Sequence, residues 1–201
     1  MQVGTTTLNI TSPHKGVLSW VNFGAGADTI AAGDTLTYTL PNATDSVLNL
    51  VSGGLATAID GSIISNGNVY VMNKNGIVIG ATAVVNAGGF YASAIDEPLA
   101  AANFALSGSL TYNGTTGGNV VVNGTSAAGS VAQLQAVGSG NNIVLAGNSV
   151  TVNAGTFYGN LTARTIGGAV ALAQDGFSPY QSQKALESLS KPFLNSFIEI
   201  Y

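Results

Sequence analysis

Residues 66–95 read NGNVYVMNKNGIVIGATAVVNAGGFYASAI, and this stretch decides the fold. Short apolar runs alternate in it with Asn-Gly and Gly-Gly pairs, which mark tight turns. The run 69–73 has a period of two, as a β-strand does. Such short strands at close, regular spacing are typical of a chain that coils into a solenoid rather than one that folds back in long hairpins.

The composition excludes several classes of protein. The 201-residue chain is 46% hydrophobic but only 7% charged, against about 25% charged residues in ordinary soluble domains. Its net charge is −4 and its five basic residues are scattered, so nucleic acid is not expected as a partner. Because cysteine is absent, neither disulfides nor thiolate metal sites are expected. There is also no apolar run of about 18 residues, the length of a membrane-spanning helix.

Further strands are predicted on both sides of the central stretch. They cover 5–12, 16–23, 34–40, 46–51 and 61–65 before it, and 110–118, 119–124, 142–147, 149–155 and 169–174 after it. Both faces of 16–23 carry apolar groups, so this strand is expected to be covered on two sides or to end a stack. In 34–40, Leu36, Tyr38 and Leu40 are expected to face inward. A helical turn is predicted at 99–104.

Two spacings suggest the length of one coil. The motif at 86–91 recurs at 153–158, 67 positions later (153 − 86), and the runs that begin at 119 and 142 differ by 23 (142 − 119). Both fit coils of 20-odd residues. About eight such coils, stacked at the spacing of neighbouring strands, would make a rod about 40 Å long.

The last part of the chain lacks this pattern of short apolar runs separated by Asn and Gly turns. From Asp175 onward, residues 178–181 are typical of a helix start and 196–201 of a strand. The sequence therefore predicts a β-solenoid domain at 1–174 and a C-terminal helix/strand tail at 175–201. Three roles remain open for the tail: a cap on an open end of the solenoid, a docking segment for a partner, or an unrelated extension.

Little catalytic chemistry is expected. His14 is the only histidine and is interpreted as a solvated loop residue, so neither a two-histidine metal site nor a histidine relay can form. The acidic residues lie among turns, where Asx side chains bond their own backbone, and only Asp96 and Glu97 are adjacent. No catalytic, metal or cofactor site is therefore predicted, and the chain is not expected to be an enzyme. A polysaccharide-active β-helix enzyme remains an alternative.

The central stretch also resembles a known family. Together with LNITSPHKGVLSWVNFGAG (8–26) and SVLNLVSGG…IDGSI (46–63), it is similar, in the same order, to the haemagglutination-activity domain. This is the secretion domain of filamentous haemagglutinin-like exoproteins that use two-partner secretion. The resemblance covers 5–95 and continues to 174 as ordinary coils. Where the family usually has Asn-Pro-Asn-Gly, this chain has Lys as the second residue of the turn.

The resemblance implies a right-handed parallel β-helix with an N-terminal cap. It implies export through an outer-membrane β-barrel transporter whose periplasmic transport-associated domains bind the unfolded chain, and β-helix folding nucleated at the cell surface. Such proteins are adhesins or biofilm factors, whose ligands are host or matrix glycans or proteins. An export signal would have been removed, since 1–10 has no signal-peptide pattern. The alternative is a subunit that stacks end to end into an extracellular filament.

The site prediction has two parts. The turn motif expected to contact the transporter is Asn73, Lys74, Asn75 and Gly76. The residues expected to be structural are Trp20, Phe23, Asn86, Gly88 and Gly89. The Asn residues near strand ends are interpreted as structural, with carbohydrate contact as the alternative.

Overall fold

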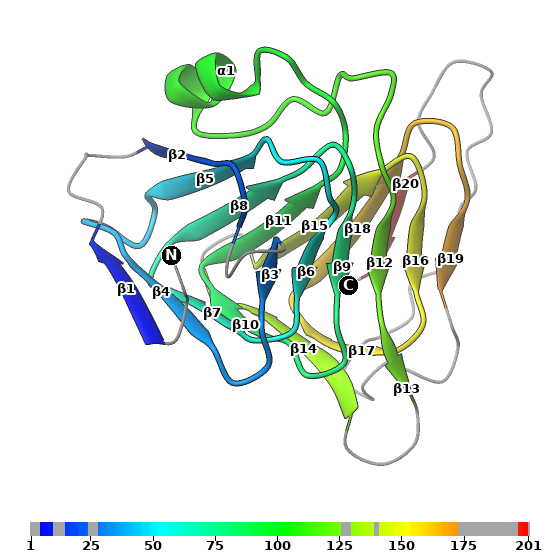
Figure 1. Cartoon of the computed structure of the whole chain (residues 1–201), viewed down its shortest axis with the longest axis horizontal. Helices are drawn as coiled ribbons and strands as arrows, with labels where there is room; N and C mark the ends of the chain where they lie inside the picture. Colours follow the sequence, from blue (N-terminus) through cyan, green and yellow to red (C-terminus); the bar gives the residue numbers. More distant parts are fainter. Residues whose placement is uncertain are drawn as a thin grey trace.

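A computed structural model describes residues 5–9, 15–23, 28–125, 130–138, 141–172 and 197–200 of the chain. Three sheets of predominantly parallel strands surround a common interior, and the chain passes from one sheet to the next in a fixed order (Figure 1). The fold is a parallel β-helix, as predicted. We use "coil" for one passage through the three sheets.

The strands are assigned to sheets as follows. Sheet B contains β2 (Lys15–Trp20), β5 (Ser46–Val51), β8 (Asn68–Met72), β11 (Gly89–Ser93), β15 (Asn142–Gly147), β18 (Asn160–Thr165) and β20 (Phe197–Ile200). Sheet C contains β3 (Thr29–Ile30), β6 (Thr57–Ile59), β9 (Ile77–Ile79), β12 (Val120–Val122), β16 (Val150–Val152) and β19 (Val170–Leu172). Sheet A contains β1 (Thr5–Asn9), β4 (Thr35–Thr39), β7 (Ser62–Ser65), β10 (Val84–Ala87), β13 (Gly124–Thr125), β14 (Ser130–Ala136) and β17 (Gly155–Tyr158).

The described strands form six coils in sheet B, from β2 to β18, rather than the eight expected. Where nothing is inserted, one coil contains 21 or 22 residues. Ser46 pairs with Asn68, 22 residues later (68 − 46), and Asn68 pairs with Gly89, 21 residues later (89 − 68). Between coils 4 and 5 it rises to 53, from Phe90 to Ile143 (143 − 90). Helix α1 (Ala100–Ser107) and the antiparallel pair β13–β14 account for the extra length, so fewer coils fit.

The 67-residue repeat does not correspond to stacked coils, and this interpretation was wrong. Asn86 lies in β10 and its partner in the next coil is Gln135, not Asn153. Asn153 follows β16, at the corner between sheets C and A, whereas Gly88 marks the corner between sheets A and B. Similar turns recur at different corners because every corner needs a tight turn. The runs at 119–124 and 142–147 likewise begin in different sheets.

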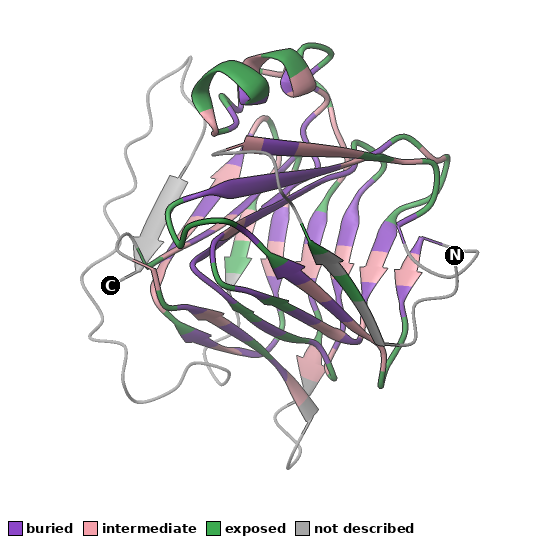
Figure 2. Ribbon diagram, turned by 90° about the vertical axis from the view of Figure 1, so that its left-hand side faces the viewer, coloured by how far each residue is buried: buried purple, intermediate pink, exposed green. Residues whose placement is uncertain are grey.

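Buried hydrophobic residues of all three sheets form one continuous cluster in the interior. Figure 2 shows buried positions along the strands of each sheet. Leu36, Tyr38 and Leu40 are 1%, 1% and 3% exposed, which confirms their predicted orientation. In sheet C, Ile59 stacks on Ile79, and Ile79 on Val122. Such columns bury apolar surface continuously from coil to coil, and each buried side chain contributes roughly 1.5–3 kcal/mol.

The outer face of sheet B is also covered, so this sheet is buried on both sides. Val17 packs against an outer cluster, while Leu18 and Trp20 pack against the interior. In the first coil, however, no side chain of β2 is fully buried and Val21 is 74% exposed, so 16–23 follows the other predicted placement, at the end of the stack. The cover includes α1, which begins at Ala100 and continues to Ser107, beyond the helical turn expected at 99–104. The strand expected at 110–118 was wrong: this segment follows α1 as a loop that makes an isolated bridge from Gly117 to Ile95.

The two ends of the stack differ. At the start, β1 pairs in parallel with β4 and adds a strand to sheet A ahead of coil 1. At the other end, the strand expected at 196–201 is present as β20, which pairs antiparallel with β18. The helix expected from residue 178 lies outside the described residues, as does His14. The role of the tail stays a prediction.

We predict that a buried amide in coil 2 stabilises the first two coils. Asn49 is fully buried; its Oδ1 accepts from Tyr38 Oη (2.6 Å) and Trp20 Nε1 (3.0 Å), and its Nδ2 donates to the Tyr70 carbonyl (3.1 Å). Asn49→Leu leaves these groups unpaired and should cost about 3 kcal/mol, measured by urea unfolding followed through Trp20 fluorescence. Asn86→Ala, at an exposed position, is the control and should stay within about 0.5 kcal/mol. Equal effects of the two changes would contradict the assignment.

We also predict a loss of stability at alkaline pH. Burial raises the pKa of Tyr38, Tyr70 and Tyr112 above the ordinary value of 10.0. Because these tyrosines stay neutral in the folded state, their contribution to stability is fully present below pH 10. Above pH 10 the unfolded chain ionises, and the contribution falls by about 1.4 kcal/mol per pH unit for each tyrosine. Urea midpoints measured from pH 8 to 12 test this. Tyr112→Phe removes a buried hydroxyl without a hydrogen-bond partner, so it should flatten the decline without destabilising the protein at pH 8. An unchanged decline would argue against the tyrosines as its source.

Candidate functional site

The turn at 73–76 joins β8 to β9, and so links sheet B to sheet C in coil 3. Gly76 N donates to the Asn73 carbonyl (3.0 Å), which closes a β-turn, and Asn75 N donates to Asn73 Oδ1 (3.0 Å). Gly76 has a φ of 127°, which L-residues with side chains rarely adopt. Asn at the first position and Gly at the fourth are thus local requirements of the turn.

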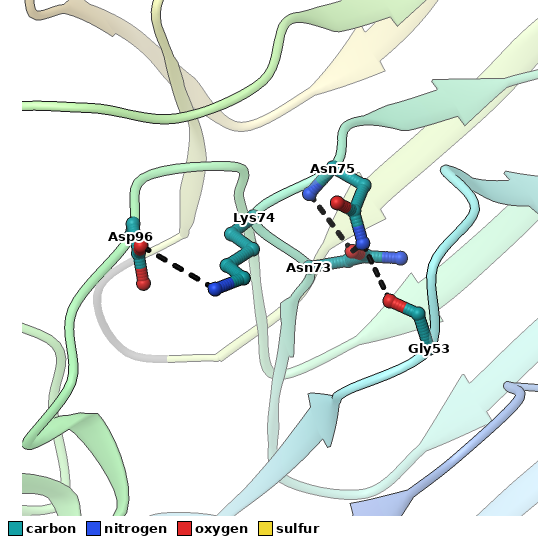
Figure 3. Close-up of polar contacts among 5 residues, drawn as sticks. All are labelled: Gly53, Asn73, Lys74, Asn75 and Asp96. Atoms are coloured by element: carbon teal, nitrogen blue, oxygen red, sulfur yellow. Dashed lines mark hydrogen bonds and ion pairs between the residues drawn. The ribbon is translucent and has the colours of Figure 1, made fainter.

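Two amide side chains connect this turn to coil 2. Asn73 is fully buried, and its Nδ2 donates to the Leu55 carbonyl (2.8 Å) and to Thr57 Oγ1 (2.9 Å). Asn75 Nδ2 donates to the Gly53 carbonyl at 2.6 Å (Figure 3). These side-chain hydrogen bonds continue the pairing between coils 2 and 3 around the corner between sheets B and C, where no regular backbone ladder forms.

Coil 4 packs on the other side of the turn. Lys74 Nζ lies 3.6 Å from Asp96 Oδ2, but both side chains are partly exposed, so the pair contributes at most about 1 kcal/mol (Figure 3). A Cβ on Gly118 would lie 2.5 Å from the Asn75 carbonyl carbon, so the coils approach closely here. Of the four turn residues, only Lys74 and Asn75 are exposed.

Trp20 and Phe23 lie together at the end of β2 in coil 1. Their rings meet edge to face, with centroids 5.2 Å apart. Phe23 is fully buried, and its N–H donates to Asp28 Oδ1 (2.7 Å). This pair sits two coils before the turn at 73–76, so the structure does not join the two groups into one site.

The glycines at the corner between sheets A and B allow close backbone approach. A Cβ on Gly88 would lie 3.0 Å from the Gly67 carbonyl carbon, and one on Gly89 would lie 2.7 Å from Asn68 Oδ1. Asn86, in contrast, is exposed on the outer face of sheet A.

The adjacent carboxylates of Asp96 and Glu97 interact with different partners. Glu97 is 8% exposed, and its Oε1 accepts from Thr111 Oγ1 (2.5 Å) and Asn113 N (3.1 Å), whereas Asp96 faces Lys74. Sequence reasoning treated this pair as a polar break and missed the role of Glu97 in folding the following loop. It also missed Asn49, although an Asn inside the apolar run 46–51 is a signal for a buried amide.

The described residues contain no group of three or more His, Cys, Asp or Glu side chains that could hold a metal ion. No helix in the described part of the chain is both long and apolar enough to cross a membrane.

Comparison with known proteins identifies the family. A family model described as the TPS secretion domain matches residues 3–192. The chain belongs to the TPS secretion domain family. The resemblance to two-partner secretion proteins is therefore confirmed, and the match continues past residue 174. Membership of this family makes the chain part of a secreted exoprotein that a partner outer-membrane transporter recognises.

One relative adds detail. The heme/hemopexin-binding protein of Haemophilus influenzae (strain ATCC 51907 / DSM 11121 / KW20 / Rd) is 32% identical over 79 residues. The alignment covers 39% of this chain and 8% of that protein. This TPS secretion domain chain thus matches only a small part of the relative's length.

We predict that the buried and exposed residues of the turn contribute differently to stability. Asn73→Ala removes an amide that bonds Leu55, Thr57 and Asn75, and should cost about 2 kcal/mol in urea unfolding. Lys74→Ala removes only an exposed ion pair, so it should change stability by about 0.5 kcal/mol or less, and less still in 1 M salt. A Lys74 effect as large as that of Asn73 would contradict this assignment.

Proposed function

We propose that this chain is a secretion module that a two-partner outer-membrane transporter recognises, while it is unfolded, through the segment 73–76. After export, the module nucleates β-helix folding at the cell surface. The observation that carries the proposal is the family match over residues 3–192, in a chain whose N-terminal coils each bond to the preceding one.

The turn geometry supports a division of roles within the motif. Asn73 and Gly76 are buried and serve the turn itself, so changing them disturbs folding. Asn75 is exposed, and across coils it bonds only the Gly53 carbonyl among the hydrogen bonds of the described residues. It is therefore the position at which transporter recognition and folding can be separated experimentally. Lys74 is exposed as well, in place of the family's usual Pro.

The register of the strands supports nucleation in the early coils. Each strand of coils 2 and 3 pairs in parallel with the strand of the coil before it. Because the buried amide of Asn73 reaches back to coil 2, coil 3 can form on coil 2 as a template. Each later coil then finds an edge of the same kind.

An adhesin or biofilm role at the cell surface is part of the proposal. The outer face of sheet A supports it, since one row across five strands is Thr37, Ile64, Asn86, Gln135 and Tyr158, without any charge. A neutral glycan or a protein of the host or matrix suits such a face. The heme and hemopexin named for the relative are ligands of that protein, and the short alignment makes them a weaker choice here.

A filament subunit is the second candidate. The edges of β17 and β19 end the described stack in sheets A and C, which favours addition of another copy. Against it, β20 lies antiparallel along β18, where a neighbour's strand would add in sheet B. Light scattering distinguishes the two: fibres that grow with concentration favour the filament, and a monodisperse monomer removes it.

We predict that Asn75→Ala impairs export more than folding. In cells that also make the partner transporter, the fraction of chain found in the medium should fall several-fold, while the yield of refolding from urea changes little. Asn148→Ala is the matched control: Asn148 occupies the same kind of corner in coil 5, is exposed, and bonds Asn119 in the coil before (3.3 Å). The control should leave both export and refolding near the unmodified level.

Two results would count against the role of the segment. Equal loss of export and refolding in Asn75→Ala would make the turn purely structural. Equal loss of export in Asn75→Ala and Asn148→Ala would mean that any corner defect slows export.

A further inference from the structure

Residues 94–118, which we call the strap, leave coil 4 after β11 and return to it before β12. Their two ends meet: Ile95 and Gly117 form an antiparallel bridge, and Gly118 N donates to the Ala94 carbonyl (2.9 Å). A Cβ on Gly117 would lie 2.2 Å from that carbonyl oxygen, so the crossing is too tight for a side chain. The strap is therefore a loop whose two ends are held together by backbone hydrogen bonds.

The strap covers the outer face of sheet B (Figure 1). Its buried residues form a second cluster with residues of the sheet, separate from the interior of the β-helix. The strap contributes Ile95, Ala100, Phe104, Leu110 and Tyr112, and the sheet contributes Leu48, Tyr70, Met72 and Ala146.

The strap reaches back to coils that precede it in the chain. Phe104 is fully buried and meets Tyr70 of coil 3 edge to face, with centroids 4.9 Å apart. Lys15 Nζ, from coil 1, donates a hydrogen bond to the carbonyl of Leu106 near the end of α1. A segment that leaves from coil 4 is thus fastened to coils 1 and 3.

Glu97 holds the strap in this folded form. Its Oε1 accepts hydrogen bonds from both Thr111 Oγ1 and Asn113 N, which joins the start of the strap to its return. Tyr112, between these two, has a φ of 56°, so the loop is bent sharply around the carboxylate.

We propose that the strap is a lock for the first four coils. Among the described residues that precede the strap, half-buried side chains of sheet B itself, namely Val17, Leu50 and Tyr91, pack against this cluster. Leu48, Tyr70 and Met72 gain buried apolar partners from outside sheet B when Phe104 and its neighbours dock. Coils 1–3 can therefore pair their backbones first, yet remain open and weakly stable until the strap arrives.

The consequence of this lock for export rests on the proposed function. Folding outside the cell prevents a chain from sliding back through its transporter. The step that makes export irreversible then waits until the chain has been exported through residue 113, rather than occurring as soon as the opening coils emerge.

The order of folding can be measured on the full chain without any transporter. During refolding from urea, pulsed hydrogen exchange should show amides of β5 and β8 acquiring full protection together with the amides of α1. A population in which β5 and β8 are fully protected while α1 still exchanges freely would overturn the proposal.

Two variants in the same helix sharpen the test. Phe104→Ala removes the buried anchor, whereas Leu106→Ala changes a side chain that is 80% exposed. Phe104→Ala should speed native-state exchange in β2, β5 and β8 by about a hundredfold and leave β16 and β17 nearly unchanged. Leu106→Ala should change neither group. Equal effects of the two variants, or loss of protection in all coils alike, would contradict a local lock.

If Phe104→Ala does not fold, Thr111→Val serves instead, since it removes one bond to Glu97 and leaves the apolar anchor in place. It should speed exchange in β2, β5 and β8 by about tenfold relative to β16 and β17. No difference between these regions would also overturn the proposal. Because none of these measurements involves the transporter, their failure leaves the export result for Asn75→Ala untouched, and the reverse also holds.

Discussion

Hydrogen bonding between successive coils is the constraint on which this structure depends. Its parallel strands are three to seven residues long in most positions, and each finds its backbone partners in the coil before or after it. The pairing must also continue around corners, where backbone groups diverge. There, amide side chains supply the missing bonds, as Asn73 and Asn75 do toward coil 2 and Asn153 does toward Asn123. The abundance of Asn in an almost uncharged chain follows from this need, because Asn bonds both ways without carrying charge.

Burial then distinguishes the three sheets. Sheets A and C present one face to the interior and one to solvent, while sheet B is covered on its outer face by the strap. Sheet B therefore reads as a nearly continuous apolar run, as in Val69, Tyr70, Val71 and Met72, and sheet A as an alternating one. The second cover brings residues from coil 4 onto earlier coils. It breaks the purely nearest-neighbour character of a solenoid, in which each repeat contacts only the next.

Export and folding make opposite demands on such a chain. A transporter that recognises an unfolded segment needs the coils to stay open, whereas the folded exoprotein needs them closed. If the transporter recognises the turn at 73–76, as we propose, the two demands fall on different residues, since Asn73 is fully buried and Asn75 is exposed. Late docking of Phe104 provides the closure that the early coils lack. The same weak, sequential pairing that suits transport thus becomes stable once coil 4 is complete.

The sequence by itself determined the fold class, the inward positions of the strand at 34–40, the turn at 73–76 and the family. These depend on local patterns: a period of two, Gly and Asn at turns, and motifs in a fixed order. Only the tertiary structure decided which coil stacks on which. The Asn-Ala-Gly motif at 86–88 and at 153–155 marks corners of different kinds, because every corner asks for the same turn chemistry. The role of Glu97 and the reach of Phe104 to Tyr70 were also invisible in the sequence. Contacts between residues far apart in the chain depend on how many residues each coil contains, and insertions change that number without leaving a periodic signal.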